Sequence, residues 1–116
     1  MAKADVTVFT DKDLNFYAQI EFKVKYILDT MKHYYQRENR QLLKAILESY
    51  FNTKESKEFW KPYIEKELKA KFGIDEEVYG MKVERVDLQN EKVYVYYRFQ
   101  TRKKKKQPKK YEDIIL

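Results

Sequence analysis

The stretch KVYVYYRFQT, residues 92–101, decides the fold of this chain. Apolar and polar positions alternate along it with a period of two, which is the period of a β-strand, because successive side chains point to opposite faces of a sheet. One face is apolar and is expected to be buried; it carries Val93, Val95, Tyr97 and Phe99. The other face mixes aromatic and polar side chains and is expected to stay open; it carries Lys92, Tyr94, Tyr96, Arg98 and Gln100.

The segment before this strand is predicted to pair with it. Its apolar positions are Met81, Val83 and Val86. The alternation slips near Arg85, which indicates a β-bulge. Leu88 to Glu91 are expected to hold the turn, so residues 79–101 form a C-terminal β-hairpin.

A second hairpin is predicted at the N-terminus. Residues 5–10 are rich in β-branched side chains and indicate a short strand, and Asp11 to Asp13 suit a turn. Residues 16–26 alternate strictly, but Phe16, Ile20 and Val24 would also share one face of a helix. We favour the strand because a helix would leave Phe22 and Tyr26 in solvent.

Between the hairpins the apolar period changes to that of a helix. The first predicted helix carries Ile27, Leu28, Met31, Tyr34 and Tyr35. The second ends at Asn52 and carries Leu42, Leu43, Ile46, Leu47 and Tyr50. The third runs from an N-cap at Thr53 to a C-cap at Gly73 and carries Phe59, Trp60, Tyr63, Ile64, Leu68 and Phe72. Pro62 is expected to kink this third helix or to divide it in two near Trp60.

These elements predict a two-layer α+β fold, with an N-terminal hairpin, two or three helices and a C-terminal β-hairpin. Residues 1–101 are expected to form a single domain. Residues 102–116 are expected to be a flexible, disordered basic arm that ends in an acidic and apolar tip, because a dense block of like charge repels itself and does not pack into a core.

The positive charge of the chain is concentrated in that arm. The whole chain has 25 Lys and Arg against 19 Asp and Glu, a net charge of +6. Residues 1–101 hold 18 of the basic and 17 of the acidic side chains, so the predicted domain is nearly neutral. The basic residues of the arm are Arg102, Lys103, Lys104, Lys105, Lys106, Lys109 and Lys110.

The arm and the open face of the 92–101 strand together predict a small protein that binds nucleic acid, with single strands favoured. Tyr94 and Tyr96 can stack on bases while Arg98 and the arm contact phosphates. Tyr17, Lys23 and Lys25 would extend this face if residues 16–26 form a neighbouring strand. The alternative is a homo-oligomeric structural or protein-interaction protein of viral or plasmid origin. It would form a homodimer through the aromatic face, and its basic arm would bind an acidic partner.

The sequence favours a protein that is not an enzyme and needs no cofactor or metal. It has no Cys and a single His, His33, so a catalytic triad or a Cys/His zinc site lacks its parts. The minor alternative is a Mg²⁺-dependent nuclease that uses carboxylates such as Asp75 and Asp87. No apolar run approaches the length of a membrane span and no signal peptide is visible, so a cytoplasmic location without a membrane partner is expected.

Two short segments of the arm resemble known signals. The tip, Tyr111 to Leu116, is acidic and then apolar, so it is expected either to dock on the domain or to be captured by a protein partner through its apolar side chains. It is similar in kind to the tails of bacterial single-strand binding proteins. Lys103 to Lys106 resemble a basic nuclear-localisation signal.

Overall fold

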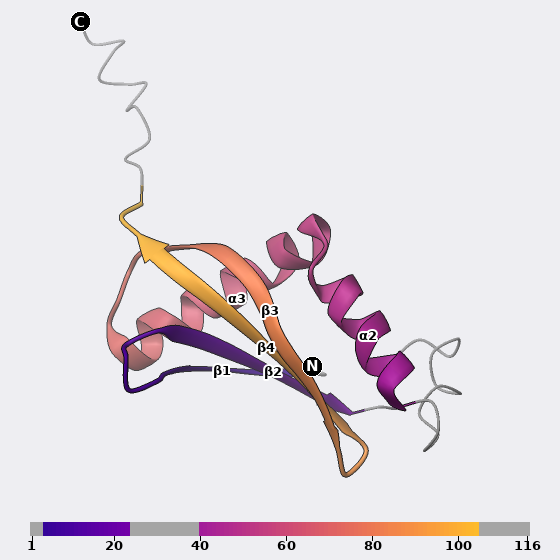
Figure 1. Ribbon diagram of the computed structural model, residues 1–116. Helices are drawn as coiled ribbons and strands as arrows, with labels where there is room; N and C mark the ends of the chain where they lie inside the picture. The colour runs from indigo at the N-terminus through magenta and orange to yellow at the C-terminus, as the bar shows by residue number, and fades with distance from the viewer. Residues whose placement is uncertain (1–3, 24–39, 105–116) are drawn as a thin grey trace, which may run out of the picture.

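A computed structural model describes residues 4–23 and 40–104, which form one antiparallel sheet and two helices (Figure 1). The strand order is β1-β2-β4-β3, so the KVYVYYRFQT strand is one of the two central strands. The α+β class is confirmed, and the described strands of each predicted hairpin pair antiparallel. The predicted first helix, the end of the 16–26 strand and residues 105–116 lie outside the described residues. The elements are β1 (Ala4–Thr10), β2 (Phe16–Lys23), α2 (Arg40–Phe51), α3 (Lys54–Phe72), β3 (Glu77–Gln89) and β4 (Lys92–Arg102).

The N-terminal hairpin is closed by Asp11. Its side-chain carboxylate accepts hydrogen bonds from the backbone N–H groups of Asp13 and Asn15, at 2.9 Å each. These bonds tighten the loop between β1 and β2 and are typical of aspartate in turns. Residues Phe16–Lys23 form the strand β2, so the strand interpretation of these residues is confirmed and their helical alternative is wrong.

The C-terminal hairpin closes with two residues. Asn90 and Glu91 both have positive φ angles, 52° and 60°, as the central positions of a type I′ turn require. The predicted turn was too long, because Leu88 and Gln89 still pair with β4. The predicted bulge near Arg85 is confirmed by a register shift between Val83 and Arg85, and a second shift follows Tyr79.

The core lies between one face of the sheet and the two helices. In Figure 1, α3 runs behind the strands and α2 lies beside β3. The apolar face of β4 is almost wholly buried, as its alternation predicted. The side chains at the centre of this core are Val8, Ala18, Ile20, Leu43, Leu47, Phe51, Ile64, Leu68, Val78, Val83, Val86, Val93, Val95, Tyr97 and Phe99.

Tyr97 ties the strand layer to the helix layer. Its hydroxyl donates to the backbone carbonyl of Phe51 at 2.5 Å and lies 3.2 Å from the Ser56 hydroxyl. These partners sit at the end of α2 and the start of α3. Burial raises the pKa of Tyr97 to about 12. The one polar atom that β4 sends into the core is therefore satisfied at the junction of the two helices.

Both helices bury a narrower stripe than the sequence predicted. In α2 the buried residues are Leu43, Leu47 and Phe51, whereas Leu42 and Tyr50 are exposed. A helix turns 100° per residue, so only positions three or four apart can share its buried line. The predicted caps of α3, Thr53 and Gly73, are confirmed.

The third helix continues through Pro62 as one element of 19 residues, so of the two outcomes expected at Pro62, a kink or a division, the division is wrong. Its apolar face also differs from the prediction, because Phe59 and Tyr63 point to solvent. Ile64 and Leu68 alone of the predicted set are fully buried.

Side chains of α3 and of the turn between α2 and α3 form hydrogen bonds with backbone groups of the two edge strands. The Lys71 ammonium donates to the Val8 carbonyl of β1 at 2.7 Å. On β3, the Val78 N–H donates to Glu65 at 2.8 Å and the Val83 N–H donates to Asn52 at 2.9 Å. An edge strand with free backbone groups is a template for pairing with another chain, so these bonds protect the sheet.

Candidate nucleic-acid interface

The open face of the sheet is built by the register of its four strands. β2 pairs with β4, which is the condition under which Tyr17 and Lys23 extend this face, and β1 adds a third strand beside them. Paired residues of antiparallel strands project from the same face. One row across the sheet is Phe9, Tyr17, Arg98 and Lys82. The next row is Thr7, Gln19, Tyr96 and Arg85.

Three rings on this face form a contiguous cluster, which we call the aromatic platform: Phe9, Tyr17 and Tyr96. Phe9 and Tyr17 are stacked, with ring centroids 5.5 Å apart and planes at 17°. Phe9 also meets Tyr96 edge-on at 6.3 Å. All three rings are partly exposed. The platform thus joins β1, β2 and β4 and offers apolar ring surface to solvent.

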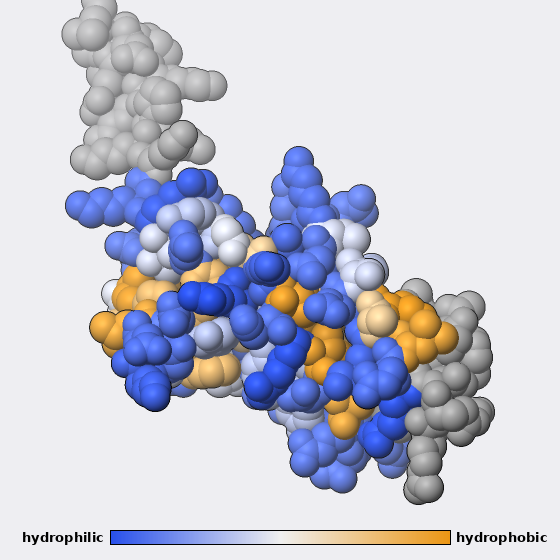
Figure 2. Space-filling model, viewed as in Figure 1, coloured by the Kyte–Doolittle hydropathy of each residue, from blue (hydrophilic) through white to orange (hydrophobic). Residues whose placement is uncertain are grey.

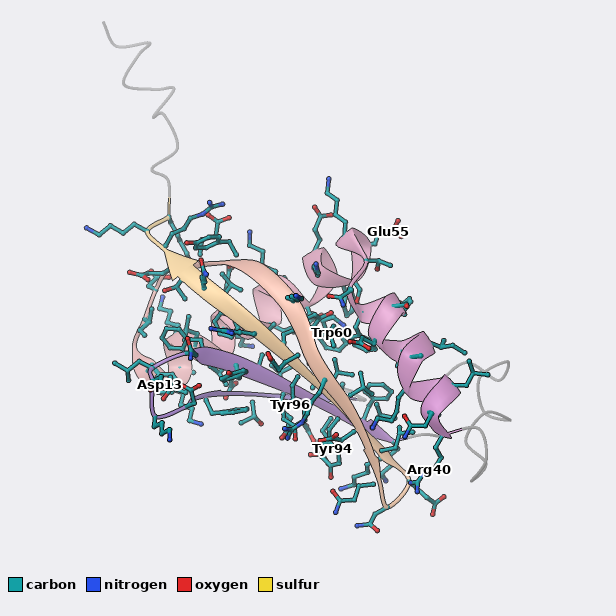
Figure 3. The ribbon with its side chains drawn as sticks, viewed as in Figure 1. Asp13, Arg40, Glu55, Trp60, Tyr94 and Tyr96 are labelled. Carbon is teal, nitrogen blue, oxygen red and sulfur yellow. The ribbon has the colours of Figure 1, made fainter. Side chains whose placement is uncertain are left out.

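Tyr94 and Tyr96, both named from the sequence, follow one another along this side of β4 in Figure 3. Tyr94 lies one row beyond the platform, where its neighbours across the sheet are Glu21 and Asp87. The register therefore separates the two tyrosines. Tyr96 belongs to the aromatic platform, whereas Tyr94 stands between two carboxylates.

The loop between β1 and β2 positions one side of the platform. The Tyr17 hydroxyl donates to the Asp11 carboxylate at 3.3 Å, and Asn15 accepts a hydrogen bond from Arg98 at 3.1 Å. Desolvation and the nearby Asp11 charge raise the pKa of Tyr17. Hydrogen bonds from Asn15 hold the pKa of Asp11 below its usual value. The turn that closes the hairpin thereby also orients a tyrosine and an arginine of the open face.

Three cations of the open face lie in the two rows that hold the platform, whereas Lys23 and Lys92 face each other at the other end of β4. Arg85 lies over the ring of Tyr96, with its guanidinium carbon 4.4 Å from the ring centroid, a distance at which cation–π attraction acts. The end toward the last residues of β4 holds the cations Lys82, Arg85 and Arg98, and also Glu84, whose charge acts on Tyr17. The opposite end holds Asp5, Glu21 and Asp87. There Glu21 pairs with Lys92 at 2.9 Å and raises the pKa of that lysine.

The base of the predicted arm is attached to the sheet. Arg102 is the last residue of β4, and its guanidinium lies 2.9 Å from Glu77 and over the ring of Tyr79. Glu77 also pairs with Lys61 at 2.6 Å, and hydrogen bonds from both cations lower the pKa of Glu77 to about 2. Two residues on, Lys104 pairs with Asp75 at 2.8 Å.

The structure thus places Arg102 and Lys104 in ion pairs, whereas the sequence assigned both to phosphate contacts. Lys103 is exposed between them. The remaining basic residues named for the arm, Lys105, Lys106, Lys109 and Lys110, lie outside the described residues. The predicted partner site at Tyr111 to Leu116 lies outside them as well.

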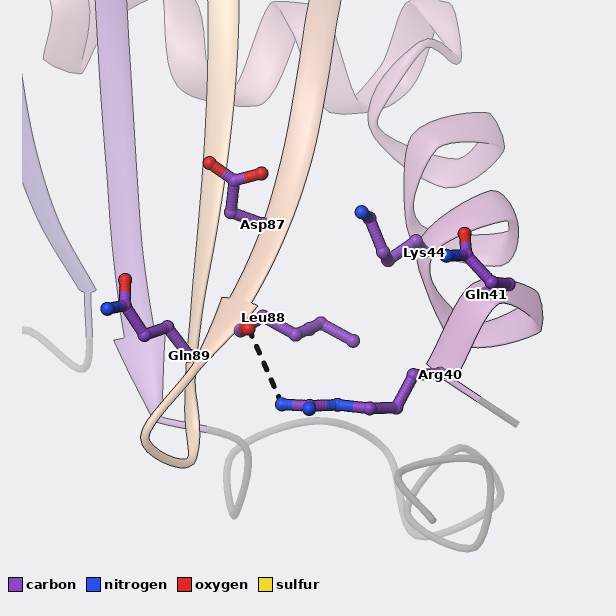
Figure 4. Close-up of a pocket in the computed structure, with 6 residues that line it drawn as sticks. All are labelled: Arg40, Gln41, Lys44, Asp87, Leu88 and Gln89. Carbon is purple, nitrogen blue, oxygen red and sulfur yellow. Dashed lines mark hydrogen bonds between the residues drawn. The ribbon is translucent and has the colours of Figure 1, made fainter. Parts of the chain in front are cut away.

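A hollow of about 310 Å³ opens between the start of α2 and the end of β3 (Figure 4). It is lined by Arg40, Gln41, Lys44, Asp87, Leu88 and Gln89. The Arg40 guanidinium crosses its floor and donates to the Leu88 carbonyl at 3.4 Å. The lining thus carries both signs of charge, and it lies apart from the platform.

The carboxylates named for a nuclease each face a cation. Asp75 contacts Lys104 and Lys69, and Asp87 accepts a hydrogen bond from Arg85 at 3.0 Å. Within residues 4–23 and 40–104, no group of three or more acidic or histidine side chains is placed to hold a metal ion. Among the same residues, no helix has the length and apolarity to cross a membrane.

The sequence missed three residues of this interface: Phe9, Lys82 and Arg85. Phe9 was assigned to a strand, but its contact with Tyr17 depends on the register of β1 against β2. Lys82 and Arg85 flank a bulge, which moves Arg85 opposite Tyr96. Comparison of the chain with models of known families, with curated proteins and with solved structures gives no match.

Proposed function

We propose that this protein binds single-stranded nucleic acid without catalysing a reaction, and that bases stack on the aromatic platform of the open sheet face. The observation that supports this proposal is the grouping of three partly exposed rings with Arg85, Arg98 and Lys82 beside them. Every base has a π-face, so a platform of this kind holds a strand with little regard to sequence.

Single strands suit this surface better than duplexes. A base can stack on a protein ring only when it is not already stacked and paired within a helix. The rings of the platform come from three adjacent strands of one sheet face, and such a face does not enter a groove of a duplex. The neighbouring arginines and Lys82 would meet the phosphates of a strand whose bases lie on the rings.

The ion pairs at the base of the arm are compatible with phosphate binding. Arg102 and Lys104 pair with Glu77 and Asp75 at the surface, and exposed pairs of this kind contribute about 0–1 kcal/mol. A phosphate can therefore displace either carboxylate at small cost. The arm then adds charge attraction that is not specific for sequence, and the platform adds stacking.

The test is the salt dependence of binding to a labelled single-stranded oligonucleotide. Seven phosphate contacts from the arm contribute about −5 to the slope of log K against log salt on single strands, and the three cations beside the platform add about −2. A chain that ends after Lys104 keeps β4 and its ion pairs but lacks four of the seven cations, and its slope should be shallower by about 3. A slope that does not change on truncation contradicts a role for the arm.

The same experiment separates this proposal from its alternatives. Retention of the oligonucleotide without cleavage, in the presence of Mg²⁺, is expected. A stable oligomer that retains no nucleic acid would favour the structural or protein-interaction protein. Cleavage that is lost in Asp75→Ala or Asp87→Ala would favour the nuclease.

A further inference from the structure

The outer surface of α3 carries a line of four exposed side chains: Glu55, Phe59, Pro62 and Lys66. Their spacing of four, three and four residues keeps them on one side of the helix. This side is opposite to the buried residues Ile64 and Leu68. The line therefore faces away from the sheet, and in Figure 3 Glu55 lies at the end of the helix remote from the platform.

The apolar centre of this line is unusually exposed. Phe59 is 57% exposed and its neighbour Tyr63 is 50% exposed. Hydrophobic side chains also come to the surface beside α2 in the view of Figure 2, whereas hydrophilic ones cover most of that view. Large apolar side chains that gather on a surface mark places where another molecule binds.

The exposed rings are held by the core. Phe59 meets Trp60 edge-on at 5.0 Å and Tyr63 at 5.6 Å. Trp60 stacks on Phe51, a buried core residue, at 6.2 Å. Rings held in this way lose little conformational freedom when a partner covers them, which is a property of residues that dominate binding energy.

The charges at the two ends of the line are complementary to those of the same line on a second copy of the chain. The end near the start of α3 is acidic at Glu55, and the other end is basic at Lys66. If a second α3 lies antiparallel, with the two-fold axis between Trp60 and Lys61, Glu55 meets Lys66 of the other copy and Phe59 meets Pro62. Each contact occurs twice, as a two-fold interface requires. The antiparallel arrangement also opposes the two helix dipoles favourably.

We propose that two copies of this protein form a homodimer through the outer face of α3, with the helices antiparallel. The helices and the platform lie on opposite faces of the sheet, so the dimer leaves both platforms open. This interface differs from the one expected from the sequence, which placed a homodimer on the aromatic sheet face. The dimer does not depend on nucleic-acid binding, and either can fail without the other.

The first test is the mass of the full chain in solution, measured by sedimentation equilibrium over a range of concentrations. A monomer–dimer equilibrium is expected. Phe59→Ala removes a central contact twice per dimer and should raise the dimer dissociation constant about 100-fold. The control is Leu42→Ala, an exposed apolar residue of α2 away from the line, which should leave the constant unchanged. A wild-type chain that stays monomeric at millimolar concentration, or a dimer unaffected by Phe59→Ala, overturns the proposal.

A charge exchange tests the antiparallel arrangement. Glu55→Lys makes both ends of the line basic, and Lys66→Glu makes both ends acidic, so each variant alone should dimerise about tenfold more weakly. Mixing the two should restore dimerisation as a heterodimer, and the double variant should form a homodimer again. A mixture that dimerises no better than its components overturns the proposed pairing. The four substituted residues, Leu42, Glu55, Phe59 and Lys66, are all exposed. Circular dichroism of each variant checks that the fold is kept.

Discussion

Tyr96 and Tyr97 are neighbours in β4 with the same side chain, yet they serve opposite faces of the sheet. Tyr97 is 0% exposed, and its hydroxyl bonds to Phe51 and lies beside Ser56. Tyr96 is partly exposed, with Phe9 at its edge and Arg85 over its ring. The same residue type therefore stabilises the fold on one face and offers a binding surface on the other. The alternation of side chains along β4 alone decides which of these two roles each tyrosine has.

The difference between the two tyrosines shows which face of the sheet contributes to the free energy of unfolding and which is available for binding. On the core face, aromatic surface is removed from water and polar atoms are paired, so substitutions there should change the free energy of unfolding. On the open face, the rings keep surface in water, and that surface is available to a ligand. Substitutions there should change affinity and leave stability nearly unchanged.

The largest effect is expected at Tyr97. Tyr97→Ala leaves a cavity in the core and should lower the free energy of unfolding by about 3–5 kcal/mol. Tyr97→Phe keeps the ring but leaves the Phe51 carbonyl without its donor, and should cost about 1–3 kcal/mol. Tyr96→Ala, the matched change on the other face, should cost less than about 1 kcal/mol. Urea denaturation measures all three, and equal losses at the two positions would contradict the comparison.

A smaller effect is expected at Ser56, the second polar neighbour of Tyr97. Ser56 is buried and its hydroxyl lies 3.2 Å from that of Tyr97. Ser56→Ala removes this contact while the bond from Tyr97 to Phe51 remains, so stability should fall by about 1 kcal/mol. The control is the double variant Tyr97→Phe/Ser56→Ala. It should lose less free energy of unfolding than the sum of the two single variants, because the two residues share one hydrogen-bond network. Full additivity would show that the two hydroxyls do not interact.

The smallest stability effect is expected on the open side, at Glu77. Its pKa is lowered to about 2 by Arg102 and Lys61, so the ionised carboxylate favours the folded state. This contribution is fully present above the unfolded pKa, near 4.5, and is lost as the pH falls toward 2. Glu77→Gln should reduce the loss of stability between pH 5 and pH 2. Denaturant midpoints of both chains across that range measure the difference, and parallel pH curves would contradict the ion-pair assignment.

Much of the fold could be predicted because its signals are local. The alternation in β4, the N-cap at Thr53 and the C-cap at Gly73 each depend on a few neighbouring residues. The buried stripes of the helices could not be predicted as well, because Phe59 and Tyr63 are apolar in sequence but face away from the sheet. Their exposure depends on how α3 is rotated against the core.

The candidate site was predicted only in part, for a related reason. Tyr96 and Arg98 follow from the strand pattern. Phe9 and Arg85 join them through strand register and a bulge, which depend on pairing between distant segments. The ion pair of Arg102 with Glu77 depends on the same pairing. The run of basic residues in the sequence assigns Arg102 to a free arm. In the structure, the antiparallel pairing of β3 with β4 extends as far as Arg102, which pairs with Glu77.

The most direct test of the central claim is the affinity of Tyr96→Ala for a labelled single-stranded oligonucleotide, at fixed salt and with the arm intact. Stacking contributes about 1–3 kcal/mol per base, so the dissociation constant should rise about 5- to 150-fold. Tyr50→Ala, an exposed tyrosine on α2, should bind as the wild type does. If Tyr96→Ala also binds as the wild type does, while truncation after Lys104 abolishes binding, the open sheet face is not the interface and the account is contradicted.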